Sequence, residues 1–118
     1  MFSHIMIGGN DIAAAKSFYD AVLGALGVEP GVIDPKGRCF YRTETGVFAI
    51  STPIDGNAAS HGNGSTVGFL ADSPEAANAW HTAGLANGGS TCEEPPGPRG
   101  DLYFCLLYTS PSPRDPSI

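Results

Sequence analysis

The chain has 118 residues, enough for one domain with a sizeable hydrophobic core but not for two independent domains. Twelve acidic and six basic residues give a formal net charge of −6, which argues against nucleic-acid binding because a phosphate backbone requires a basic surface. There is no apolar run of about 18 residues to span a membrane, and the three cysteines are too scattered for a disulfide or zinc framework. We therefore expect a cytoplasmic protein with neither nucleic acid nor membrane as a partner.

The first 27 residues predict a strand, a turn and an amphipathic helix. Residues 2–7 form a mostly apolar run typical of a strand, and two glycines follow as a tight turn. Residues 11–23 carry apolar side chains at three- and four-residue steps, which places them on one helical face. Asn10 or Asp11 can cap this helix, because a short side-chain oxygen accepts from its free N–H groups. Either of two later glycines can end it in the left-handed conformation.

The middle of the chain predicts a hairpin followed by a linker. Residues 28–37 are mostly loop because prolines and glycines punctuate them, with a short strand at 32–33. Residues 38–43 and 46–51 are rich in β-formers and are joined by a glycine-containing turn, so they predict a β-hairpin. Residues 52–65 are dense in Gly, Asn, Ser and Pro and predict a connection between two halves.

The second half repeats the opening pattern. Residues 66–71 predict a strand, and an Asp-Ser-Pro sequence then starts a helix over residues 74–87. His81 on this helix is expected to face solvent, because only its neighbouring tryptophan fits the apolar stripe. Residues 91–94 and 101–104 predict two further strands with a rigid Pro-rich loop between them.

Several motifs, in this order, resemble the vicinal oxygen chelate superfamily, the group of glyoxalase, bleomycin-resistance and ring-cleaving dioxygenase proteins. They are His4 in the first strand, Phe-Tyr and then Leu-Gly in the first helix, the Gly-rich middle, and the Asn-Gly-Gly sequence after the second helix. The resemblance covers about residues 1–104. It implies an α+β fold of two paired βαβββ modules, whose sheets form a cup that commonly holds a metal or a small ligand.

The resemblance implies module one at about residues 1–54, a linker at about 55–65, and module two at about 66–104 without its last strand. Residues 105–115 are, in one reading frame, the translation of a transposon-end adapter used in DNA sequencing. We therefore interpret residues 105–118 as an adapter-derived tail of a metagenomic sequence, and exclude them from the domain.

The candidate ligand-binding residues are His4, Thr66 and His61, and the candidate metal ligand is His4. Metal-dependent members of the family place a histidine on the first strand, which His4 matches. The resemblance places the other ligands at about Ala49 and Thr66 and on the missing strand. Alanine cannot ligate, and a divalent metal normally requires three or more protein ligands. His61 lies in a polar loop from which it can reach the cup, although a solvated loop histidine is the commoner case.

The orientation of the first strand decides whether His4 has a functional role. Strand alternation places Phe2, His4 and Met6 on one face, and Ser3, Ile5 and Ile7 on the other. The isoleucines suit the helix stripe better, so His4 is expected to face the inside of the cup. An ordinary packed or hydrogen-bonded histidine is the alternative reading.

Two functions remain open from the sequence. The first is binding of a small, partly apolar molecule in the cup without a metal, as in the bleomycin-resistance members. The second is a glyoxalase-type lyase or isomerase, in which a divalent metal (Zn, Ni, Mn or Fe) polarises the substrate's oxygens. The missing ligands favour the first. We also expect a homodimer in the native full-length form.

Deletion of residues 110–118 should change the free energy of unfolding by no more than about 0.5 kcal/mol, because a Ser- and Pro-rich segment buries little core. Thermal unfolding of the full and shortened chains, followed by circular dichroism, measures the difference. A loss of several kcal/mol would show that the segment belongs to the packed domain.

Overall fold

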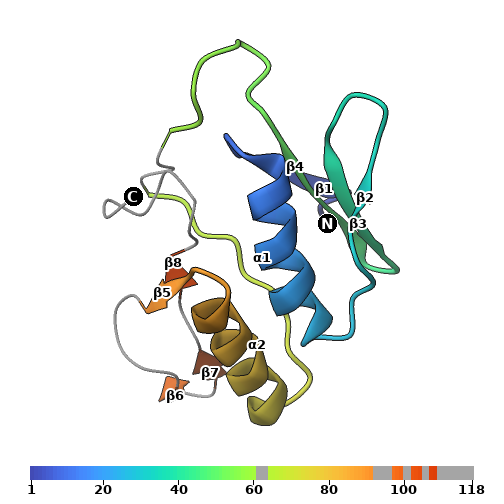
Figure 1. Ribbon diagram of the computed structural model, residues 1–118. Helices are drawn as coiled ribbons and strands as arrows, with labels where there is room; N and C mark the ends of the chain where they lie inside the picture. Colours follow the sequence, from blue (N-terminus) through green and yellow to red (C-terminus); the bar gives the residue numbers. More distant parts are fainter. Residues whose placement is uncertain (61–63, 92–96, 100–101, 105–106, 109–118) are drawn as a thin grey trace.

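The computed structural model describes residues 1–60, 64–91, 97–99, 102–104 and 107–108. In this part of the chain, a four-stranded mixed sheet is covered on one face by helix α1, and helix α2 packs beside α1 (Figure 1). The predicted α+β class is confirmed. Neither helix in these residues is long and apolar enough to cross a membrane.

The elements of residues 4–51 lie where the sequence predicted them. β1 runs parallel to β4, whereas β3 runs antiparallel to both β4 and β2, which gives the sheet order β1-β4-β3-β2. The helix start is capped by Asp11, whose carboxylate accepts from the Ala14 N–H at 3.0 Å. The elements are β1 (His4–Gly8), α1 (Ile12–Gly24), β2 (Val32–Ile33), β3 (Cys39–Thr43) and β4 (Gly46–Ser51).

The main core lies between α1 and the sheet. The apolar stripe of α1 packs against alternate residues of β3 and β4, so one sheet face is buried and the other is left uncovered by the helix. Each large apolar side chain buried in this way stabilises the fold by about 1.5–3 kcal/mol. The core side chains are Phe18, Tyr19, Val22, Leu23, Cys39, Tyr41, Phe48 and Ile50.

The second half is organised around α2 (Pro74–Ala86). Ser73 caps this helix by accepting from the Ala76 N–H at 3.1 Å, and Pro74 occupies its first turn, where no donor is needed. Two short antiparallel ladders follow, one of β5 with β8 and one of β6 with β7. The strands are β5 (Ser90–Thr91), β6 (Gly97–Arg99), β7 (Leu102–Phe104) and β8 (Leu107–Tyr108).

Two of these strands lie outside the predicted positions. β6 forms within the segment predicted as a Pro-rich loop, and a two-stranded ladder tolerates its proline because each strand is an edge. β8 lies within the predicted tail and pairs with β5. Residues 109–118 of that tail lie outside the described residues.

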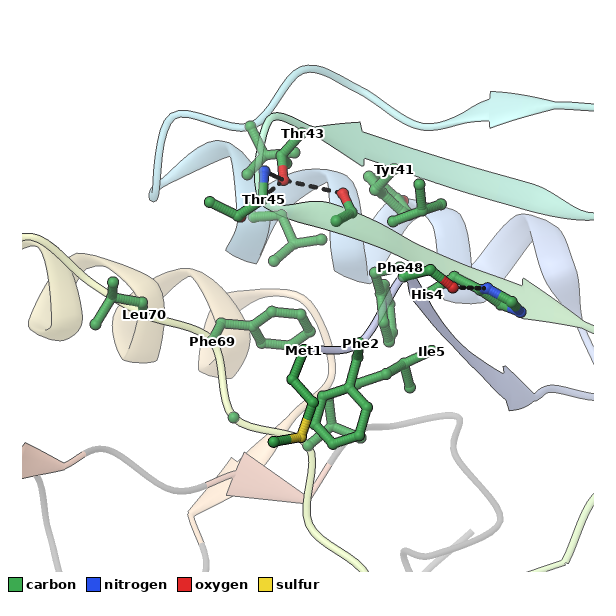
Figure 2. A pocket seen from close by; sticks show the side chains of 17 residues that line it. Met1, Phe2, His4, Ile5, Tyr41, Thr43, Thr45, Phe48, Phe69 and Leu70 are labelled. Carbon is green, nitrogen blue, oxygen red and sulfur yellow. Dashed lines mark hydrogen bonds between the residues drawn. The ribbon is translucent and has the colours of Figure 1, made fainter.

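The strand predicted at residues 66–71 does not form. A strand needs a neighbour for its N–H and C=O groups, and β1 finds one in β4. In the described part of the chain no strand pairs with residues 66–71. The segment is instead held by its aromatic side chain: the rings of Phe69 and Phe48 meet edge to face with centroids 5.1 Å apart (Figure 2). The segment thus packs against the sheet without joining it as a strand.

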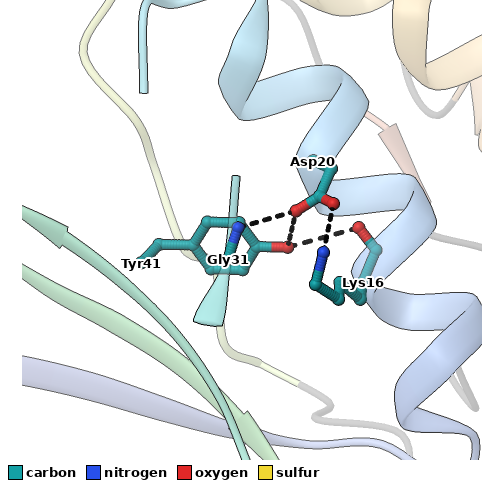
Figure 3. Close-up of polar contacts among 4 residues, drawn as sticks. All are labelled: Lys16, Asp20, Gly31 and Tyr41. Atoms are coloured by element: carbon teal, nitrogen blue, oxygen red, sulfur yellow. Dashed lines mark hydrogen bonds and ion pairs between the residues drawn. The ribbon is translucent and has the colours of Figure 1, made fainter. Parts of the chain in front are cut away.

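Asp20 of α1 accepts three hydrogen bonds, one from the sheet, one from the loop after α1 and one from α1 itself (Figure 3). Its Oδ1 accepts from the Tyr41 hydroxyl at 2.8 Å and from the Gly31 N–H at 2.9 Å, and its Oδ2 accepts from Lys16 Nζ at 2.6 Å. Burial raises the pKa of Asp20, but the hydrogen bonds from Lys16, Gly31 and Tyr41 outweigh it and hold the pKa below its usual value. Burial also raises the pKa of Tyr41, so its hydroxyl remains a donor.

Replacement of Gly31 by alanine should destabilise the protein by about 1–3 kcal/mol, because overpacking a filled core forces its neighbours to move. A Cβ at Gly31 would lie 2.5 Å from Cys39 Sγ and 2.7 Å from Tyr41 Cζ, both on fully packed side chains. The matched control is Gly24→Ala, since a Cβ there meets nothing within 4 Å. The control should leave stability unchanged or raise it by up to about 1 kcal/mol. Urea unfolding measures both, and equal effects would contradict the prediction.

Candidate ligand-binding site on the open sheet face

The sheet face opposite α1 presents two rows of side chains. Residues paired across neighbouring strands project from the same face. Phe48 and Ile50 face α1, so the residues that alternate with them face away. We call this surface the open face; it comprises His4, Met6, Phe40, Arg42, Val47 and Ala49.

His4 lies on the open face, as the alternation of the first strand predicted. The residue is exposed and is paired in register with Val47 of β4. Its Nδ1 lies 2.8 Å from the Ser3 hydroxyl oxygen, and this hydrogen bond orients the imidazole ring. The ring is therefore held at one end of a row that runs from His4 through Val47 to Arg42.

Two guanidinium groups lie over the Phe40 ring. The Cζ atom of Arg42 is 4.7 Å from the ring centroid and that of Arg38 is 5.2 Å away, both within the range of cation–π attraction. Arg38 is also bound to Asp34, with its Nε 2.7 Å from Oδ2. Arg42 is exposed and forms no ion pair within the described residues.

These arginines were not among the site residues predicted from the sequence. Their signal was nevertheless present, because Arg38, Phe40 and Arg42 alternate along one strand and therefore share a face.

The predicted linker lies against the other end of the open face. A Cβ built on Gly8 would lie 3.3 Å from the Ala59 Cβ and 3.6 Å from the Pro53 Cγ. The Ala59 N–H donates to the Asn10 side-chain oxygen at 2.7 Å, which fixes this segment to the start of α1. Residues of the linker thus limit the open face at the end of β1.

The other predicted site residues do not join His4. Thr66 is exposed in the unpaired segment 66–71 and does not belong to the open face. His61 lies outside the described residues. Among the residues that are described, no three His, Cys, Asp or Glu side chains are grouped so that they could hold a metal ion. On the open face, Val47 and Ala49 present only hydrocarbon, so these residues do not fit a divalent metal with His4.

His81 is buried, contrary to the prediction that it faces solvent. It is only 7% exposed, and burial lowers its pKa because the charged imidazolium loses hydration. The helix α2 contacts α1 as well as β5 and β7, so more than one of its faces is covered.

The comparisons with known proteins agree with this architecture. The family model described as "Glyoxalase/Bleomycin resistance protein/Dioxygenase superfamily" matches residues 1–117. The chain belongs to this superfamily. A crystal structure of a glyoxalase/bleomycin resistance protein from Albidiferax ferrireducens T118 is 58% identical, with a TM-score of 0.89; the match covers 92% of this chain and 89% of that one.

A second solved structure shows the same fold at low identity. It is a glyoxalase/bleomycin resistance protein/dioxygenase family enzyme from Burkholderia phytofirmans PsJN, 17% identical with a TM-score of 0.64; the match covers 93% of this chain and 91% of that one. None of the curated proteins compared matches the chain.

Acidification from pH 7.5 to 5.5 should destabilise the wild type more than the His81→Gln variant. The folded chain holds the pKa of His81 below its usual value of about 6.5, so the unfolded chain binds a proton first as the pH falls. The contribution of neutral His81 to the free energy of unfolding is therefore fully present above the unfolded-state pKa, and it decreases as the pH falls below that value. Urea unfolding at the two pH values measures the loss, and equal losses in both proteins would contradict the prediction.

Proposed function

We propose that the protein binds a small molecule on its open face, and that the ligand combines an anionic group with a flat apolar part. The observation that carries the proposal is Arg42, an exposed guanidinium placed over the Phe40 ring without a carboxylate partner in the described residues. A guanidinium in this state offers charge-assisted hydrogen bonds to a carboxylate, sulfonate or phosphate.

The net charge of −6 does not prevent such binding. The Debye length is about 8 Å at physiological ionic strength, so acidic side chains farther away than this are largely screened. A ligand anion in contact with Arg42 therefore responds mainly to that guanidinium and to Arg38 beside it.

The remaining open-face side chains suit an apolar body. Ala49 is fully buried between its paired neighbours Met6 and Phe40, and Met6 itself is 44% exposed. Methionine is flexible and polarisable, so it adapts to ligands of different shape. Two strand spacings, about 10 Å, separate the strand of His4 from that of Arg42. A ligand of this length would reach both groups, with His4 hydrogen-bonded to a second polar atom.

Naphthalene-2-sulfonate is a suitable probe, because it joins a permanent anion to a flat ring system. We expect saturable binding that Arg42→Gln weakens at least about fivefold, roughly 1 kcal/mol, which is a modest value for an exposed charged hydrogen bond. Added salt should weaken the binding further in the wild type. Isothermal titration calorimetry measures both effects.

The matched control is Lys36→Gln, which removes the same charge from an exposed loop residue outside the open face. It should bind the probe as the wild type does. Equal binding by the wild type and the Arg42→Gln variant would refute the proposal.

A further inference from the structure

A cavity of about 430 Å³ lies at the edge of the sheet on the side of α1 (Figure 2). Its walls come from four separate segments: the start of β1, the turn between β3 and β4, the C-terminal end of α1 with the loop after it, and residues 67–70. We call it the hairpin cavity. Its volume lies within the range of about 300–1,000 Å³ that is usual for small-molecule sites.

The wall of the hairpin cavity is largely aromatic and aliphatic. Phe48 lines it, edge to face with Phe69 and with its ring centroid 6.1 Å from that of Tyr41. Leu23 and Val28 add aliphatic surface from α1 and the following loop. Because Phe48, Tyr41 and Leu23 also belong to the main core, this wall is held rigidly.

The polar groups of the hairpin cavity are hydroxyls. The Thr43 hydroxyl donates to the Gly46 carbonyl oxygen at 3.0 Å and lies 3.2 Å from the Thr45 hydroxyl oxygen. The described lining contains no Asp, Glu, Lys or Arg side chain. His4 is bound to Ser3, the Tyr41 hydroxyl donates to Asp20, and the N-terminal amine belongs to Met1, which is fully exposed and therefore solvated. A charged ligand buried here would lose its hydration without gaining an opposite charge, so a neutral ligand is favoured.

The mouth of the hairpin cavity exposes large apolar side chains. Phe2 is 70% exposed and Leu70 is 90% exposed, and both line the cavity. An apolar molecule between them would remove its own surface and theirs from water, which is the main driving force for such binding.

We infer that the hairpin cavity is a second binding site, for a neutral aromatic or alicyclic molecule with one hydrogen-bonding oxygen. Its aromatic wall lies on the α1 side of the sheet, and it shares only His4 and Val47 with the open face. The two sites differ in the charge of the ligand they favour: the open face favours an anion, whereas the hairpin cavity favours a neutral molecule.

A matched pair of probes separates the two sites. 2-Naphthol, neutral at pH 7, has the ring system of naphthalene-2-sulfonate without its charge. We expect Phe69→Ala to weaken 2-naphthol binding at least fivefold in calorimetric titration, while Arg42→Gln and added salt leave it unchanged. The control Leu85→Ala, at an exposed residue of α2 outside the cavity, should bind as the wild type does.

Circular dichroism shows whether the Phe69→Ala variant folds. If it does not fold, a measurement on the wild type tests the hairpin cavity instead. Nuclear Overhauser effects between 2-naphthol and the rings of Phe48 and Phe69 would then support the hairpin cavity, and their absence would overturn it. Undiminished binding by a folded Phe69→Ala variant would overturn it as well. Sulfonate binding without naphthol binding would refute only the hairpin cavity, and the reverse result would refute only the function proposed for the open face.

Discussion

The hydrogen bond from Tyr41 to Asp20 fixes α1 on one face of the four-stranded sheet, and the arrangement of both proposed sites depends on this placement. Tyr41 projects from β3 into the core, and Gly31 leaves the space that its ring occupies. Lys16 keeps the Asp20 carboxylate charged, so the acceptor of this bond is strong. With α1 held there, the opposite face of the sheet is free to take a ligand, and the C-terminal end of α1 becomes a wall of the hairpin cavity.

The sequence predicted the elements whose signals are local. Asp11 lies at the start of α1 and caps it, and a glycine-containing turn joins β3 to β4. Each of these features can be recognised within a stretch of about ten residues. The strand at 66–71 was predicted wrongly because a strand depends on a partner remote in the chain, which no local pattern supplies. His81 was wrongly predicted to face solvent for a related reason. The prediction assumed that α2 buries a single apolar stripe, whereas both α1 and short strands contact this helix.

Some features of the candidate sites follow from the local sequence, whereas others depend on residues that are distant in the chain. Alternation along β1 was enough to place His4 away from the helix, and the same rule applied to β3 would have found Arg38, Phe40 and Arg42. Ala49, the predicted position of a second ligand, lies on the open face beside Met6, and Val47 lies beside His4. The hairpin cavity could not be predicted, since its four walls are distant in sequence and tertiary contacts, such as that of Phe69 with Phe48, bring them together.

The pairing register of β1 with β4 controls both proposed sites. Successive side chains on a strand point to opposite faces, so a slip of one residue would exchange the contents of the two faces. In the observed register His4 lies beside Val47 on the open face, and Ile5 lies beside Phe48 on the α1 side. The Val47 N–H also donates to the Ser3 carbonyl oxygen at 3.2 Å, which extends the pairing to the residue that orients His4. This register thus places Ile5 and Phe48 of the hairpin cavity on the α1 side, while His4 and Val47 lie on the open face and also line that cavity.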